Sequence, residues 1–157
     1  MLNDAQNIKL LSKLRRAMEV FEPYIFTKVA QLPFVMHETA ERLEKIPETS
    51  LFAPPAQRPS GLEWGGEGNY CWFLTQYTPP EELAGQPLYL YPELGGYEAM
   101  LWVDGQPYGT YATKIVVTRH GNHYCDRICA AAAPGTPIAL AIEFYAGHYV
   151  VGEQPFE

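Results

Sequence analysis

Residues 64–87 read WGGEGNYCWFLTQYTPPEELAGQP, and this stretch decides the fold of the 157-residue chain. Residues 70–77 (YCWFLTQY) carry apolar or aromatic side chains on both alternating faces, so neither face is clearly polar. A strand with this pattern is expected between two covering layers. Pro79 and Pro80 cannot donate ladder hydrogen bonds and end the strand, and a sharp turn before it is allowed by three glycines, Gly65, Gly66 and Gly68.

Residues 3–22 have the pattern of an amphipathic helix. Apolar side chains recur at helical spacing along one face, at Ile8, Leu11, Leu14, Met18 and Phe21. Asn3 or Asp4 can cap the N-terminus of this helix, and Pro23 closes it. The apolar stripe needs a partner. Packing on the sheet or on a neighbouring domain fits the mixed charges opposite the stripe better than a membrane surface does.

The rest of the chain has the pattern of short strands between turns, without alternation of strands and helices. Apolar or β-branched runs predict further strands at residues 24–30, 88–91, 98–103, 114–118 and 138–145. A short helix is expected at residues 37–45, and DGQPYG at residues 104–109 predicts a hairpin turn with Asp-Gly at its tip. Seven or eight short strands in one domain indicate an antiparallel β-sandwich or jelly roll with an N-terminal helix.

The composition limits the partners and the compartment. The formal net charge is −7 and the basic residues are scattered, which argues against nucleic acid or an anionic membrane as a partner. No apolar run approaches the ~20 residues that span a bilayer, and the N-terminus lacks the order of a signal peptide. The odd set of Cys71, Cys125 and Cys129 favours reduced thiols. A cytoplasmic location is therefore expected.

Three motifs occur in order between residues 62 and 152. They are WGG followed by Trp72-Phe73, the EA…VDG…G segment at residues 98–109, and EFYAGH at residues 143–148. In this order and spacing, the chain resembles the N-terminal, non-catalytic β-sandwich domain of bacterial family 38 glycoside hydrolases, the α-mannosidases. The resemblance implies a jelly-roll, galactose-binding-like sandwich in residues 23–152, with the helix of residues 1–22 packed on it.

The same resemblance carries expectations about function. In the family, this domain precedes a helical linker and a larger catalytic domain, which supplies the zinc site and the nucleophilic aspartate. Residues 153–157 are then expected to begin a linker in a longer zinc-dependent α-mannosidase of carbohydrate metabolism. The 157 residues themselves are expected to hold no catalytic site, cofactor or metal. The expected partners are the catalytic domain of the same chain and mannosides. Whether the full-length protein forms a homo-oligomer is left as an open alternative.

Two enzymatic alternatives rest on the residues alone. A retaining glycosidase needs two carboxyl groups about 5 Å apart, and no spacing pairs the candidates Glu63, Glu67, Glu98, Asp104, Asp126 and Glu143. The segment RHGNHYCDRIC could hold zinc or a nucleophilic cysteine through His120, His123, Cys125, Asp126 and Cys129. Its spacing matches no common ligand pair, so we favour the interpretation in which the histidines flank a hairpin turn at Gly121-Asn122.

An independent carbohydrate-binding module is the main rival from another class, because sugars stack on exposed aromatic rings. The many tyrosines and tryptophans alternate as strand positions do, which favours core packing for most of them. The candidate carbohydrate contacts are Trp64 in the glycine loop and Tyr108 and Tyr111 at the hairpin. For Trp64, we favour the other interpretation, in which the ring pins the loop onto the sandwich.

Overall fold

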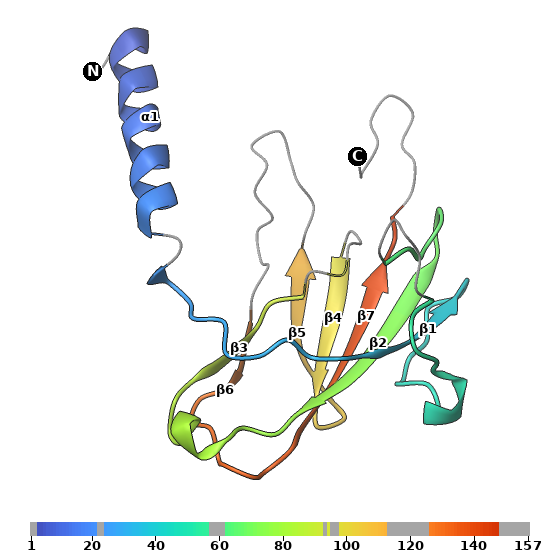
Figure 1. Cartoon of the computed structure of the whole chain (residues 1–157). Coiled ribbons are helices and arrows are strands. Elements are labelled where there is room, and N and C mark those ends of the chain that lie inside the picture. The colour runs from blue at the N-terminus through green and yellow to red at the C-terminus, as the bar shows by residue number, and fades with distance from the viewer. Residues whose placement is uncertain are drawn as a thin grey trace. The chain divides into compact units, whose positions relative to one another are not determined.

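The computed structural model describes residues 3–21, 24–56, 62–92, 94, 98–112 and 126–147. The chain forms two compact units, Met1–Gln31 and Leu32–Glu157 (Figure 1). The smaller unit holds one helix, and the larger unit holds the strands.

The helix α1 spans Asp4–Phe21, which confirms the helix predicted at residues 3–22. Its start is a capping box. The Gln6 amide donates to Asn3 Oδ1 at 2.9 Å, and the Asn3 amide donates to Gln6 Oε1 at 3.0 Å. The strand predicted at residues 24–30 is wrong, because this segment is a short turn followed by irregular backbone. Its β-branched composition does not make a strand without a neighbour to complete the ladder.

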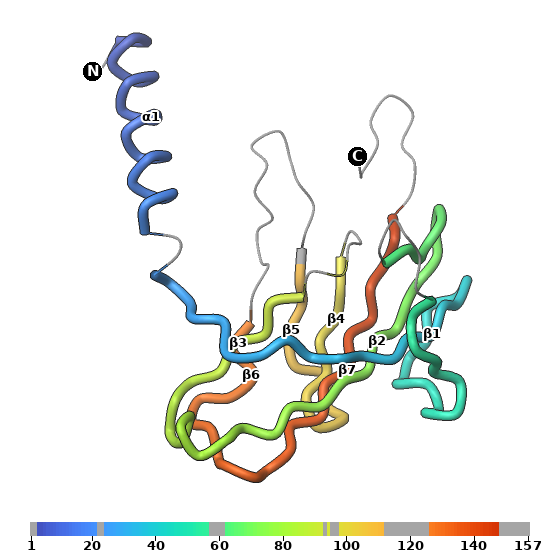
Figure 2. Tube along the Cα trace, viewed as in Figure 1, coloured from blue at the N-terminus to red at the C-terminus, as the bar shows by residue number. Residues whose placement is uncertain are grey.

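The larger unit consists of two antiparallel sheets (Figures 1 and 2). The five-stranded sheet has the order β1-β2-β7-β4-β5, and its strands are Val35–Thr39, Tyr70–Tyr77, Ile138–Tyr145, Glu98–Val103 and Gln106–Ala112. The second sheet pairs β3, Leu88–Leu90, with β6, Asp126–Cys129. Two short 3-10 helices lie at Thr49–Leu51 and Glu81–Leu83.

One hydrophobic core joins the two sheets. It contains side chains from one face of the large sheet, such as Phe73, Phe144 and Leu101, together with Leu88 of β3 and Ile128 of β6. The strand register explains why these side chains share one face of the sheet. Successive cross-strand partners across four strands are Cys71, Phe144, Ala99 and Tyr111. The described chain is thus mainly antiparallel β-sheet with one N-terminal helix, consistent with the predicted β-sandwich.

The strand β2 is buried on both faces at residues 71–73, as predicted, whereas Gln76 near its end is exposed. Cys71 and Phe73 face the core, and Trp72, which faces the other way, has an exposed fraction of 0%. Residues 40–56, which include the 3-10 helix Thr49–Leu51, reach this outer face, where the Leu43 backbone hydrogen-bonds Glu143, the cross-strand partner of Trp72. This segment is fixed to β1 by a bridge between Met36 and Ala53 and by a contact of the His37 and Phe52 rings at 5.7 Å. We call residues 40–56 the cover segment.

The hairpin of β4 and β5 confirms the predicted Asp-Gly turn. Asp104 and Gly105 have φ angles of 50° and 77°, the left-handed conformation that a tight hairpin needs and that glycine adopts without strain. The strands predicted at residues 98–103 and 138–145 match β4 and β7, and residues 88–91 match β3 to within one residue.

Other predictions differ from the structure. The helix expected at residues 37–45 is wrong, since residues 35–39 form β1 and pair with β2. The short strand β6 was not predicted. The strand expected at residues 114–118 lies outside the described residues.

Candidate functional site

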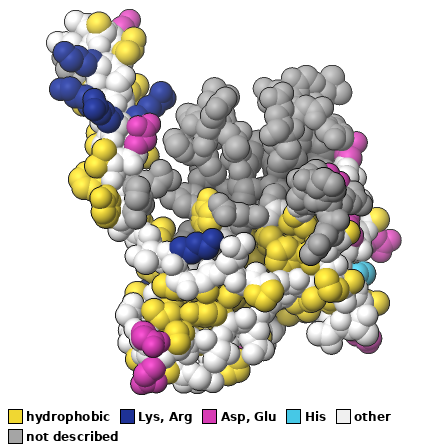
Figure 3. All heavy atoms as spheres, in the orientation of Figure 1, with side chains coloured by type: hydrophobic (Ala, Val, Ile, Leu, Met, Phe, Trp, Pro, Cys, Tyr) yellow, Lys and Arg dark blue, Asp and Glu magenta, His cyan; other side chains and the backbone are white. Residues whose placement is uncertain are grey.

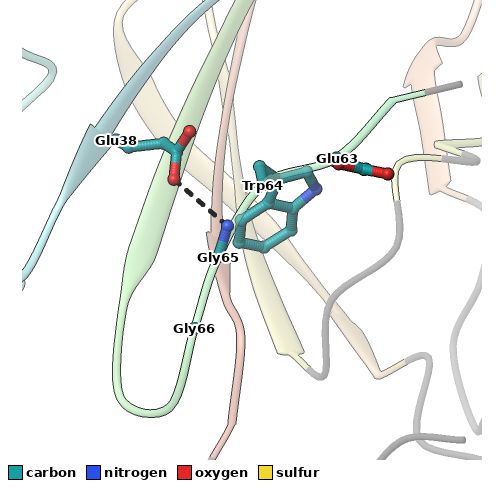
Figure 4. A pocket seen from close by; sticks show the side chains of 5 residues that line it. All are labelled: Glu38, Glu63, Trp64, Gly65 and Gly66. Carbon is teal, nitrogen blue, oxygen red and sulfur yellow. Dashed lines mark hydrogen bonds between the residues drawn. The ribbon is translucent and has the colours of Figure 1, made fainter. Parts of the chain in front are cut away.

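The glycine loop before β2 borders a pocket of about 330 Å³. It is lined by Glu38, Glu63, Trp64, Gly65 and Gly66. Gly65 and Gly66 have φ angles of 100° and 128°, and the Gly65 amide donates to Glu38 Oε2 at 3.1 Å. Figure 4 shows the Glu63 side chain directed away from Glu38. The two carboxylates therefore do not face one another as an acid and a nucleophile would.

Trp64 closes this loop onto the core. Its indole N–H donates to the Leu94 carbonyl at 2.6 Å. Its ring packs edge-on against Phe73, with centroids 5.6 Å apart, and tilted against Phe144 at 6.0 Å. The side chain is half-buried. Trp64 thus holds the loop on the sandwich, as its interpretation as a pin requires, and leaves only part of its surface for a ligand.

The two hairpin tyrosines have opposite environments. Tyr111 has an exposed fraction of 1% and belongs to the core, so its ring offers no face to a ligand. Tyr108 is 49% exposed, and its hydroxyl donates to the Arg127 carbonyl at 2.6 Å, which ties β5 to β6. Of the three predicted carbohydrate contacts, only Tyr108 presents a largely open ring.

Two further tyrosines, on or directly after β3, are also exposed. Tyr89 on β3 is 47% exposed and is the cross-strand partner of Arg127, and Tyr91 follows two residues later at 54%. We call Tyr89, Tyr91 and Tyr108 the tyrosine patch. Figure 3 shows apolar side chains gathered over the part of the body where β3 and β6 lie.

The predicted zinc or thiol segment is described only in part. His120, His123 and Cys125 lie outside the described residues, while Asp126 and Cys129 lie on β6. Cys71 and Cys129 are free thiols. Among the residues with defined positions, no group of three or more histidines, cysteines, aspartates or glutamates could hold a metal ion.

The structure reveals one polar cluster that the sequence did not predict. Glu143 on β7 lies between Trp72 on β2 and Met100 on β4, on the outer face of the large sheet. It has an exposed fraction of 6%, and Trp102 lies next to Trp72 with ring centroids 5.9 Å apart. The only sequence signal was a single carboxylate inside an otherwise apolar strand, IALAIEFY. We call Trp72, Trp102 and Glu143 the indole–carboxyl cluster.

Burial is the main influence on Glu143. Desolvation raises the pKa of its carboxyl above the usual value, while a backbone hydrogen bond from Leu43 and the charge of Arg42 lower it. Both of these residues belong to the cover segment. Because the net pKa is raised in the folded state, the protonated form favours folding. That contribution is fully present below the unfolded pKa and is lost as the pH rises through the folded pKa.

Cys71 is predicted to be unreactive while the chain is folded. Burial raises the pKa of its thiol to about 12, with a further rise from Glu38 and a reduction from a hydrogen bond with the His37 backbone. A rise of the pKa from 9.0 to about 12 lowers the thiolate fraction of Cys71 about 1,000-fold near pH 8. The thiolate is the form that reacts with alkylating agents.

Peptide mass spectrometry after iodoacetamide treatment at pH 8 measures this effect. Cys71 should stay unmodified in the native protein and react fully in urea, with half-buried Cys129 as the comparison in the same sample. Modification of native Cys71 at the rate of the unfolded chain would contradict the burial of β2.

No protein-family model, curated protein or solved structure matches this chain. Within the described ranges, no helix has the length and apolarity of a membrane span.

Proposed function

We propose that this chain is the non-catalytic N-terminal domain of an α-mannosidase-like glycoside hydrolase, with a jelly-roll, galactose-binding-like sandwich. One observation carries the proposal. The motifs of the resemblance are far apart in sequence, but they lie on β2, β7 and the β4–β5 hairpin, which are neighbours in one sheet. Trp64 of the WGG motif packs against Phe73 of β2 and Phe144 of β7. The three motifs that carry the resemblance are therefore parts of one packed unit.

In this proposal the domain braces the catalytic domain of the same chain. It contributes shape rather than chemistry, and the zinc and the nucleophilic aspartate belong to the catalytic domain. The protein acts on mannosides in the cytoplasm. Assembly of the full-length protein into a homo-oligomer is compatible with this proposal. The packing of Trp64 fastens the loop that carries the WGG motif to the core of this domain.

The coding sequence downstream of Glu157 tests the proposal most directly. A reading frame that continues for several hundred residues, with histidines and aspartates suited to zinc, is the expected result. A stop codon directly after Glu157 in the natural transcript would rule the accessory-domain function out.

The purified 157-residue chain is predicted not to hydrolyse an aryl α-mannoside. The physical reason is that Glu38 and Glu63, the carboxylates at the pocket, do not face one another. Release of the aryl alcohol is measured with and without added zinc, and a heat-killed sample is the control. Turnover above that control would show that the chain carries its own catalytic site.

A carbohydrate-binding module is the second candidate, and the tyrosine patch favours it. Tyr89 and Tyr108 on strands and Tyr91 directly after β3 are half-exposed aromatic rings, the kind of surface on which a sugar face stacks. Titration of the chain with mannose and mannobiose tests this function, with Tyr108→Ala as the variant. Saturable binding that Tyr108→Ala weakens at least tenfold would favour the module, and no binding at millimolar sugar would exclude it.

A further inference from the structure

The indole–carboxyl cluster contains three buried polar atoms without a hydrogen-bond partner in the described protein. They are Trp72 Nε1, Trp102 Nε1 and Glu143 Oε1. Two of the atoms are donors, and the third belongs to a carboxyl group that accepts hydrogen bonds when ionised. A buried polar group left unpaired costs about 1–3 kcal/mol, so three together require an explanation.

The strand register brings the three side chains to one place. Trp72 is the direct cross-strand partner of Glu143, and Trp102 is the partner of Ala141, which lies two residues before Glu143 on the same face. Directly opposite side chains are about 4.5–5.5 Å apart at their Cβ atoms, and diagonal neighbours such as Trp102 and Glu143 are about 7–8 Å apart, still within reach of an aromatic ring. The indoles of β2 and β4 approach one another over β7, with ring centroids 5.9 Å apart. Ala141, the residue of β7 opposite Trp102, has a small side chain with an exposed fraction of 3%.

The cover segment closes the cluster from outside. Glu143 has a backbone hydrogen bond with Leu43, and Arg42 lies close enough for its charge to act on the carboxyl. His37 of β1 lies on the same sheet face, as the cross-strand partner of Trp72, and Glu98 of β4 lies on that face as the partner of Tyr145. Glu98 is exposed. Bulk solvent does not reach the three unpaired atoms.

We propose that Trp72, Trp102 and Glu143 form a buried binding site for one water molecule between the large sheet and the cover segment. The water accepts hydrogen bonds from the two indole N–H groups and donates one to Glu143 Oε1. Buried waters make about three hydrogen bonds, typically to polar groups that would otherwise be unsatisfied. The bound water thus offsets the cost of the buried carboxyl and links β2, β4 and β7 beneath the cover segment.

Nuclear magnetic resonance tests the site cleanly because the chain has only three tryptophans. Each gives one indole N–H signal in a ¹⁵N spectrum. Water-selective nuclear Overhauser spectra of the wild type should show cross-peaks from a long-lived water to the Trp72 and Trp102 signals. Trp64 is the internal control, since its indole donates to the Leu94 carbonyl, and its signal should show no such peak.

Two Glu143 variants locate the water. Glu143→Gln keeps an acceptor oxygen and should retain both cross-peaks, whereas the similarly sized but apolar Glu143→Met should lose them. If Glu143→Met does not fold, Trp72→Phe removes one donor and should weaken the Trp102 cross-peak at least twofold. Wild-type spectra without cross-peaks at Trp72 and Trp102 would overturn the proposal. Cross-peaks that persist unchanged in Glu143→Met or Trp72→Phe would overturn it as well.

Discussion

Replacing Trp72 with alanine should destabilise the larger unit by about 3–5 kcal/mol, the usual cost of deleting a fully buried aromatic ring. Trp72 is the largest of the fully buried side chains in the described residues, with an exposed fraction of 0%. The variant would lose its contact with the Trp102 ring and leave a cavity between the sheet and the cover segment. Since a typical domain has a total stability of only about 5–15 kcal/mol, this single change removes a large share of it.

Thermal and urea unfolding measure the loss. The melting temperature of Trp72→Ala should fall by roughly 10 °C or more. Leu51→Ala is the matched control, because Leu51 is a large apolar residue at 53% exposure, and its truncation should change the stability by less than about 0.5 kcal/mol. Equal melting temperatures for the two variants would show that Trp72 is not enclosed by two layers.

The parts of the fold that the sequence predicted correctly are those with local signals. The β4–β5 hairpin follows from an Asp-Gly pair between alternating runs, and β7 from an apolar run bounded by turns. The start of α1 follows from a cap predicted at Asn3 or Asp4, and the structure uses Asn3. In each case the residues that determine the element lie within the element or next to it.

The two wrong predictions concern segments whose structure depends on residues far away in the sequence. HETAERLEK has good helix formers, yet its first residues belong to β1 because Val35 and Met36 pair with Leu74 and Phe73, far along the chain. Residues 24–30 have strand-like composition but no ladder partner within the structure described. Long-range pairing decides both segments, and single-sequence periodicity carries no information about it.

The candidate site shows the same limit at the level of side chains. Alternation places Tyr111 and Trp72 on strands, but it does not say which strand face is covered by another layer. The burial of Glu143 depends on the cover segment, whose irregular backbone has no period to detect. The different exposure of Tyr108 and Tyr111 likewise does not follow from alternation, because the β4–β5 pairing has a register shift that leaves Tyr108 without a cross-strand partner.

Replacing Trp64 with alanine is the second large effect that we expect, at about 2–4 kcal/mol. The estimate is lower than for Trp72 because the Trp64 ring is only half-buried, although two aromatic contacts and a hydrogen bond are lost with it. Trp64→Phe is the matched control. It keeps a ring against Phe73 and Phe144 and loses the hydrogen bond to the Leu94 carbonyl, so it should cost only about 1 kcal/mol.

Unfolding curves of both Trp64 variants, together with mannobiose titrations of the folded proteins, separate the structural from the ligand-binding role of this residue. A pin predicts that stability falls from wild type to Trp64→Phe and further to Trp64→Ala, while any sugar affinity stays the same. If Trp64 instead contacts sugar, both variants should keep the wild-type stability and lose mannobiose affinity, because a ring that contacts only ligand contributes little to the unliganded fold. A Trp64→Ala protein that keeps its melting temperature and loses mannobiose binding would therefore contradict the packing of Trp64 against the core. It would also transfer the carbohydrate contact from the tyrosine patch to the glycine loop.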